Sequence, residues 1–207
     1  KPAVQKESRK LVYTEISAEE ICVKAKKAGK CAVITEAETS GIFSPVRSVT
    51  VSACEDGTYY VSSGSEKEFR ALLEDPETVK YGYDLKLQAN LLHHAGTALK
   101  GRFMDIELMH YLINPEKSHK IDILAKSYLE INLEESMPQK QETTLSLFDQ
   151  PEEEERPSRY PEAAATLMLG RKIWEEMGEM DLRDLYDTME EPLLKVLSQM
   201  EIEGVRI

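Results

Sequence analysis

Residues 30–63, KCAVITEAETSGIFSPVRSVTVSACEDGTYYVSS, decide the fold of this chain. They contain three runs of strand length, at 30–35, 46–54 and 58–62, that are rich in apolar and β-branched side chains. The Asp-Gly pair at 56–57 supplies the positive φ angles that a tight hairpin turn needs. The stretch therefore predicts an antiparallel β-meander.

Helix and strand signals alternate on both sides of the meander. Ser17-Ala18-Glu19-Glu20 is a capping box, which predicts a helix that runs to Ala28 and ends at Gly29. We expect further helices at 65–74, 85–95, 106–113, 121–129, 161–177 and 181–203, and short strands at 79–83 and 100–105. Pro192 is expected to bend the last helix. A meander followed by βα units predicts an α/β fold: one mixed sheet with helices on both faces.

Composition narrows the class of protein. The chain has 207 residues, of which 41% are hydrophobic, so it can bury a substantial core. It has no apolar run long enough to span a membrane, and residues 1–10 are polar and lack the apolar region of a signal peptide. The three cysteines are far apart, which is typical of reduced core thiols. We expect a cytoplasmic protein.

The distribution of charge and proline suggests how the chain is organised. Its net charge of -12 disfavours tight binding to nucleic acid unless basic residues gather locally. Residues 134–157 are acidic, rich in proline and poor in apolar residues, so we expect a flexible surface loop there. We predict a polar lead-in at 1–10, a domain at 11–180 that contains this loop, and a helix at 181–207.

Four segments in order carry a resemblance to a known family. Residues 79–86, 103–114, 119–129 and 191–205 are similar to segments of the 3′-5′ exonuclease (proofreading) domain of bacterial DNA polymerase I. The resemblance implies a ribonuclease-H-like (DnaQ-like exonuclease) fold. Because the last segment resembles the helix that leads into the polymerase domain, we expect such a domain to follow residue 207.

The resemblance also implies chemistry in which two Mg²⁺ or Mn²⁺ ions, held by carboxylates from three motifs, cut a phosphodiester. The first motif corresponds to residues 36–39, where Glu36 replaces the family's aspartate and Glu38 keeps its glutamate. The second motif places the neutral Gln88 at a metal-binding aspartate. Asp84 stands where the family often has asparagine, and we do not assign it to the metal site.

The third motif is a tyrosine followed by an aspartate. Tyr160 corresponds to the tyrosine that positions the attacking water, and the aspartate position falls on either Glu162 or Ala164, depending on the register. With so few carboxylates to offset the repulsion between two divalent ions, we predict a non-catalytic domain that supports a polymerase domain and contacts DNA lightly.

Two enzymatic alternatives remain open. One is an active 3′-5′ exonuclease that uses Glu36, Glu38 and Glu162, with Mn²⁺. The other is a stand-alone ribonuclease of the same fold. The four histidines have no spacing that pairs them on one helix face, so we expect surface or packing roles for them.

A further alternative is a tethering module. Residues 144–148, Thr-Leu-Ser-Leu-Phe, resemble the short peptide by which bacterial polymerases dock on the sliding clamp. Leu145, Leu147 and Phe148 are apolar anchors in an otherwise polar loop, as such docking requires. Thr144 departs from the family's glutamine.

Overall fold

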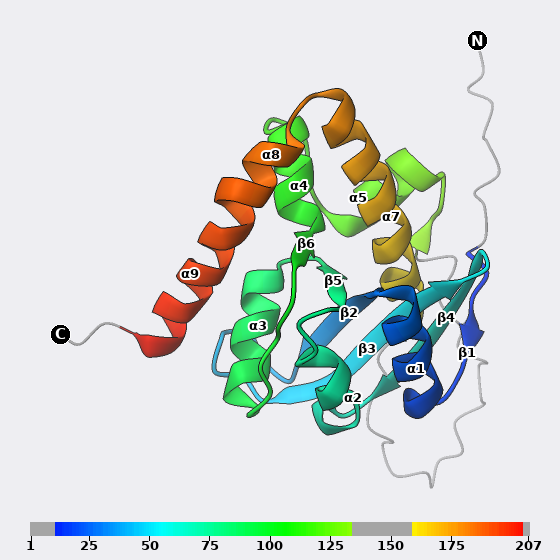
Figure 1. Ribbon diagram of the computed structural model, residues 1–207, viewed down its shortest axis with the longest axis vertical. Helices are drawn as coiled ribbons and strands as arrows, with labels where there is room; N and C mark the ends of the chain where they lie inside the picture. Colours follow the sequence, from blue (N-terminus) through cyan, green and yellow to red (C-terminus); the bar gives the residue numbers. More distant parts are fainter. Residues whose placement is uncertain (1–10, 134–158, 205–207) are drawn as a thin grey trace, which may run out of the picture.

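The computed structural model describes residues 11–133 and 159–204. They form one six-stranded mixed sheet with the strand order β1-β4-β3-β2-β5-β6 (Figure 1). The strands are β1 (Thr14–Glu15), β2 (Lys30–Ala37), β3 (Val46–Glu55), β4 (Thr58–Gly64), β5 (Val79–Gly82) and β6 (Phe103–Asp105). β2, β3 and β4 pair antiparallel, whereas β5 runs parallel to β2 and β6 parallel to β5. The predicted meander and α/β fold are confirmed.

The hairpin between β3 and β4 forms where the Asp-Gly pair predicts it. Asp56 has a φ angle of 50° and Gly57 one of 79°, so both turn residues are left-handed. The ladder pairs Glu55 with Thr58 at the turn and continues to Val49 and Gly64. β1 was not predicted; it is two residues long and pairs parallel to β4.

Helices cover both faces of the sheet. The helices are α1 (Ala18–Ala28), α2 (Glu66–Leu73), α3 (Leu85–His94), α4 (Ile106–Ile113), α5 (Ile121–Leu124), α7 (Tyr160–Glu179), α8 (Arg183–Leu185) and α9 (Glu191–Glu203). α1 and α2 pack against one face through a core that includes Ile21, Phe69 and Val51. α7 crosses the other face, where it joins α4 and α5 in a second core (Figure 1).

A close approach fixes α7 against the sheet. Gly170 lies over the ring of Tyr81 on β5, and a Cβ atom at this position would meet the ring at 2.2 Å. Glycine is therefore needed here for packing rather than for a turn. The capping box predicted at Ser17 is present, with Glu20 as its partner, and Gly29 ends α1.

Two predicted helices differ from those observed. The helix expected at 121–129 is α5 followed by a π-helical turn, Ala125–Leu129. The helix expected at 181–203 begins at Arg183, and a second π-helical turn, Tyr186–Glu190, separates α8 from α9. Pro192 is the second residue of α9 and lies just after this π-helical turn, to which it has no backbone N–H to donate.

The second π-helical turn and the first residue of α9 bring side chains to the free edge of β6. The Tyr186 hydroxyl accepts from the Asp105 N–H at 2.8 Å and donates to the Phe103 carbonyl at 3.1 Å. Glu191 accepts from the Phe103 N–H at 3.0 Å. Tyr186 is fully buried. These bonds satisfy an edge strand that would otherwise present unpaired backbone groups.

α9 is joined to α3 by a polar seam. Ser198 donates to the Asn90 side chain at 2.5 Å, and Asn90 donates to Glu201 at 2.6 Å. Asn90 is fully buried, so its bonds compensate for the loss of water. The segment from Arg183 to Glu203 is thus held against β6 and against α3. No helix of the described residues is long and apolar enough to cross a membrane.

Candidate functional site

The first motif lies at the end of β2. Glu36 is a strand residue beside an irregularity in the β2–β3 pairing, and it accepts from Ser48 on β3 at 2.9 Å. Glu38 follows the strand and is exposed. Its backbone N–H bonds to the Pro45 carbonyl, which closes the 38–45 loop. The two glutamates therefore differ in setting, since only Glu36 is held by a neighbouring strand.

Arg159 joins this strand end to the start of α7. Its Nε donates to Glu36 at 3.0 Å, and its Nη1 donates to both carboxylate oxygens of Glu162, at 2.7 and 2.9 Å. No motif in the sequence points to Arg159. The structure brings Glu162 to this cluster, whereas Ala164 is fully buried in the core. Burial raises the pKa of Glu162, and the Arg159 guanidinium opposes that shift.

Tyr160 points to a different partner. Its hydroxyl donates to the Glu15 carboxylate of β1 at 2.8 Å, and its ring meets the edge of Tyr13. Burial, followed by the hydrogen bond to Glu15, raises the pKa of Tyr160 to about 12. The phenol is therefore protonated at neutral pH and acts as a donor.

Gln88 is built into the fold. The side-chain carbonyl accepts from the Thr35 N–H of β2 at 2.9 Å, and the side-chain NH₂ donates to the Tyr83 carbonyl at 2.8 Å. Only 5% of Gln88 is exposed. Both ends of the amide thus tie α3 to β2 and to the loop after β5.

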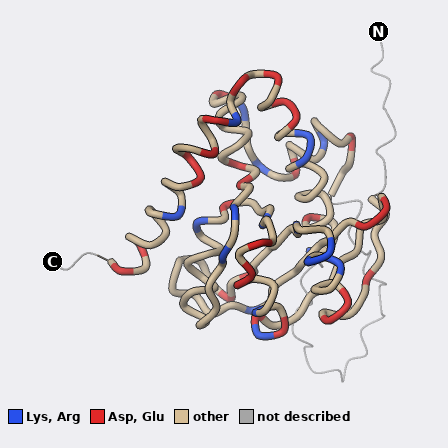
Figure 2. Tube along the Cα trace, viewed as in Figure 1, with Lys and Arg blue, Asp and Glu red and all other residues tan. Residues whose placement is uncertain are grey.

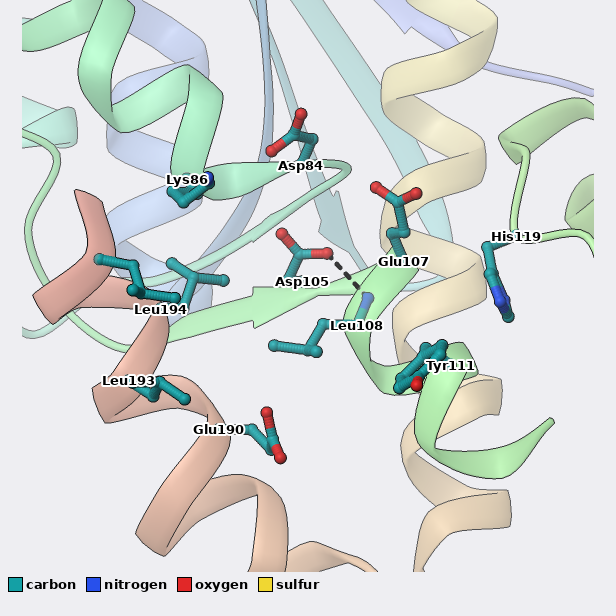
Figure 3. Close-up of a pocket in the computed structure, with 11 residues that line it drawn as sticks. Asp84, Lys86, Asp105, Glu107, Leu108, Tyr111, His119, Glu190, Leu193 and Leu194 are labelled. Carbon is teal, nitrogen blue, oxygen red and sulfur yellow. Dashed lines mark hydrogen bonds between the residues drawn. The ribbon is translucent and has the colours of Figure 1, made fainter. Parts of the chain in front are cut away.

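A separate cavity of about 290 Å³ lies beside the carboxyl ends of β5 and β6 (Figure 3). Asp84, Asp105 and Glu107 line it from one side, and Leu193 and Leu194 of α9 line it from the other (Figure 3). Asp84 and Asp105 cap the helices α3 and α4. Burial raises the pKa of Asp105 to about 6, and its bonds from the Leu108 and Leu85 N–H groups oppose the shift.

The histidines show one pairing that sequence spacing did not predict. His110 is buried, and its Nδ1 lies 2.7 Å from Nδ1 of His119. One ring must donate and the other accept. His93 and His94 are exposed near the end of α3. Within the described residues, no group of three or more His, Cys, Asp or Glu side chains is placed to hold a metal ion.

Residues 44–136 match a family described as "DNA polymerase I, ribonuclease H-like domain". These residues belong to that family. The chain is 30% identical over 138 residues to DNA polymerase I of Mycobacterium tuberculosis. This alignment covers 66% of the chain and 15% of the relative. The chain is 31% identical over 148 residues to DNA polymerase I of Pseudomonas aeruginosa, covering 68% of this chain and 16% of the relative. The chain therefore spans less than a fifth of these relatives.

Solved structures share the fold of this DNA polymerase I-type domain. A POL-domain structure of Pol1 from M. smegmatis, in complex with DNA primer-template and dNTP, aligns with a TM-score of 0.68 and 21% identity. It covers 91% of this chain and 31% of that one. Brucella melitensis NrnC with bound Mg²⁺ aligns with a TM-score of 0.65 and 13% identity over 95% of both chains. These likenesses confirm the ribonuclease-H-like fold.

The divalent ions that the fold family implies do not fit the residues at this site. Gln88 brings no charge, and both ends of its amide are already bonded within the protein. Glu36 and Glu162 are paired with Arg159. The anchors expected for the sliding clamp, Leu145, Leu147 and Phe148, lie outside the described residues.

Proposed function

We propose that this domain is a non-catalytic exonuclease-fold domain of a DNA polymerase I-type protein, in which it supports the polymerase domain and contacts DNA only lightly. The buried, doubly bonded amide of Gln88 carries the proposal. It stands where the family's pattern has a metal-binding aspartate. Two divalent ions close together repel strongly and need several carboxylates to offset that repulsion.

An apolar surface on α9 and the turn before it supports the scaffold role. Several large apolar side chains there are 41–61% exposed: Met189, Leu193, Val196, Leu197 and Met200. Most are spaced three or four residues apart, so they share one side of the helix. α9 lies along the outside of the molecule (Figure 1). The polymerase domain that such relatives contain is the partner we propose for this surface.

The charge distribution supports a light contact with DNA. The chain has a net charge of -12, and in Figure 2 lysines and arginines are interspersed with acidic residues along the described trace. A domain that holds a single-stranded 3′ end usually offers a basic groove and aromatic stacking platforms.

Because its relatives are bacterial DNA polymerases I, we propose a cytoplasmic location.

The rival function is an active 3′-5′ exonuclease with Glu36, Glu38 and Glu162 as ligands for Mn²⁺. Digestion of a 3′-labelled single-stranded oligonucleotide, in Mg²⁺ and separately in Mn²⁺, separates the two. The control is the Glu36→Ala/Glu38→Ala double variant. We expect no cleavage by the wild type above this control. Cleavage that the double variant loses would refute the scaffold proposal.

A second candidate function, docking on the sliding clamp, rests on the sequence of residues 144–148. A peptide covering 141–150 is expected to bind the clamp saturably, because its leucines and phenylalanine can fill an apolar pocket. Replacing Leu147 and Phe148 with Ala should abolish binding. A peptide without saturable binding would end this hypothesis and leave the scaffold proposal intact.

A further inference from the structure

The Arg159 guanidinium lies between two carboxylates that come from distant parts of the chain. Glu36 is 123 residues away on β2, and Glu162 is on the first turn of α7. The guanidinium reaches Glu36 through Nε and Glu162 through Nη1. The side chains of Glu36 and Glu162 are 17% and 14% exposed, whereas that of Arg159 is 37% exposed. The carboxylates are thus the more deeply placed members of the cluster.

The local structure holds all three groups in position. Arg159 is the residue before α7, and its carbonyl accepts from the Ala163 N–H at 3.0 Å. Glu162 sits in the first helical turn, where the helix dipole favours a negative charge. The other carboxylate oxygen of Glu36, Oε2, accepts from the Ser48 hydroxyl. A planar guanidinium fits such paired carboxylates because its N–H groups point in fixed directions.

The bonds of Arg159 use the same oxygens that a divalent cation would need. A hard cation binds carboxylate oxygens directly, and here Glu36 Oε1 and both oxygens of Glu162 accept from the guanidinium. A metal ion between these carboxylates would also lie within a few ångströms of a permanent positive charge. Geometry and charge therefore both oppose metal binding while Arg159 stays in place.

We propose that Arg159 is a built-in cation that takes the place of a divalent metal between Glu36 and Glu162, so that these carboxylates bind metal only when Arg159 is removed. The inference deepens the proposed function and rests on it in one respect, since metal-dependent cleavage by the wild type would contradict both. It adds a specific residue and a property that loss of activity alone does not imply: a latent metal site.

The test is a titration of Mn²⁺ into the whole chain. Binding is measured by isothermal titration calorimetry and by the electron paramagnetic resonance signal of free Mn²⁺. We expect Arg159→Ala and Arg159→Met to bind Mn²⁺ at least about tenfold more tightly than the wild type, because a charge near the carboxylates is removed. Arg159→Lys keeps the charge and should bind as weakly as the wild type. The matched control is Arg171→Ala, which removes an exposed arginine from α7, the helix that follows Arg159.

The triple variant Arg159→Ala/Glu36→Gln/Glu162→Gln should lose the gained affinity. Mn²⁺ should also raise the melting temperature of Arg159→Ala and leave that of the wild type unchanged. If the Ala and Met variants do not fold alone, recovery of helical circular dichroism on adding Mn²⁺ supports the inference, and no recovery overturns it.

Three further results would overturn it: no gain in affinity for either variant, a gain that survives in the triple variant, or equal binding by Arg159→Lys and Arg159→Ala. In all of these cases the oligonucleotide assay on the wild type still decides the scaffold proposal separately.

Discussion

The free edge of β6 and the end of β2 both depend on polar side chains that arrive from far along the chain. At β6, Tyr186 is fully buried and its hydroxyl bonds only to backbone groups. At β2, Arg159 is about a third exposed and bonds to two carboxylates. The first arrangement completes a sheet edge, whereas the second balances charge near water. We therefore expect the two regions to contribute very differently to stability.

The largest expected effect is at β6. Tyr186→Ala should lower the free energy of unfolding by about 3–5 kcal/mol, because it removes a buried ring and leaves backbone groups of β6 unsatisfied. Tyr186→Phe, which removes only the hydroxyl, should cost about 1–3 kcal/mol. Urea unfolding measures both. Tyr111→Ala is the control, since Tyr111 is half exposed; an equal loss there would refute a specific role for the β6 edge.

A pH-dependent effect is expected next to the same edge. Burial raises the pKa of Asp105 from 3.8 to about 6, so the folded state favours its protonated form. Stability from Asp105 is then fully present below about pH 4 and is lost as the pH rises through 6, by up to about 3 kcal/mol.

Unfolding measured from pH 4 to pH 7 checks this. Relative to the wild type, Asp105→Asn should become progressively more stable as the pH rises through this range. The control Asp122→Asn changes an exposed carboxylate. Parallel pH profiles for the wild type and Asp105→Asn would show that the pKa of Asp105 is the same in the folded and unfolded states, against this prediction.

The seam between α3 and α9 should give an intermediate effect. Asn90→Ala leaves the buried Ser198 hydroxyl and the Glu201 carboxylate without their amide partner, at a cost of about 1–3 kcal/mol. The matched comparison is Asn114→Ala, at the end of α4. If the two variants unfold at the same urea concentration, the seam does not help to hold α9 on the domain.

Much of the fold could be predicted from the sequence because its signals are local. The Asp-Gly turn, the capping box at Ser17 and the helix that ends at Ile113 depend on neighbouring residues, and all appear where expected. The π-helical turns do not follow from local periodicity. The turn at 186–190 accompanies the placement of the Tyr186 hydroxyl against β6, which is 81 residues away in sequence.

The candidate site shows the same limit. The motifs of the resembled family identified Glu36 and Gln88 as candidates and left Glu162 and Ala164 open as alternatives. They could not reveal that Gln88 bonds to β2, or that Arg159 faces a glutamate 123 residues earlier. The contact between His110 and His119 is likewise set by the turn between α4 and α5 rather than by helical spacing. Such pairings require the tertiary fold.

The smallest effect is expected at the end of β2. Glu36→Gln removes the ion pair between Glu36 and Arg159 but keeps an oxygen that can accept from Ser48. It should therefore lower the free energy of unfolding by no more than about 1 kcal/mol. Salt screens partly exposed charges, and 1 M NaCl should shrink this cost further while leaving that of Tyr186→Phe unchanged. Urea unfolding at low and high salt measures both variants.

A salt-independent cost above about 2 kcal/mol for Glu36→Gln would mean that the cluster holds α7 on the sheet as firmly as Tyr186 holds β6. The expected small cost has a different consequence. Glu36 would then contribute little to folding, and the main effect of its pairing with Arg159 would be on the charge at the end of β2, which Mn²⁺ titration of the Arg159 variants measures directly.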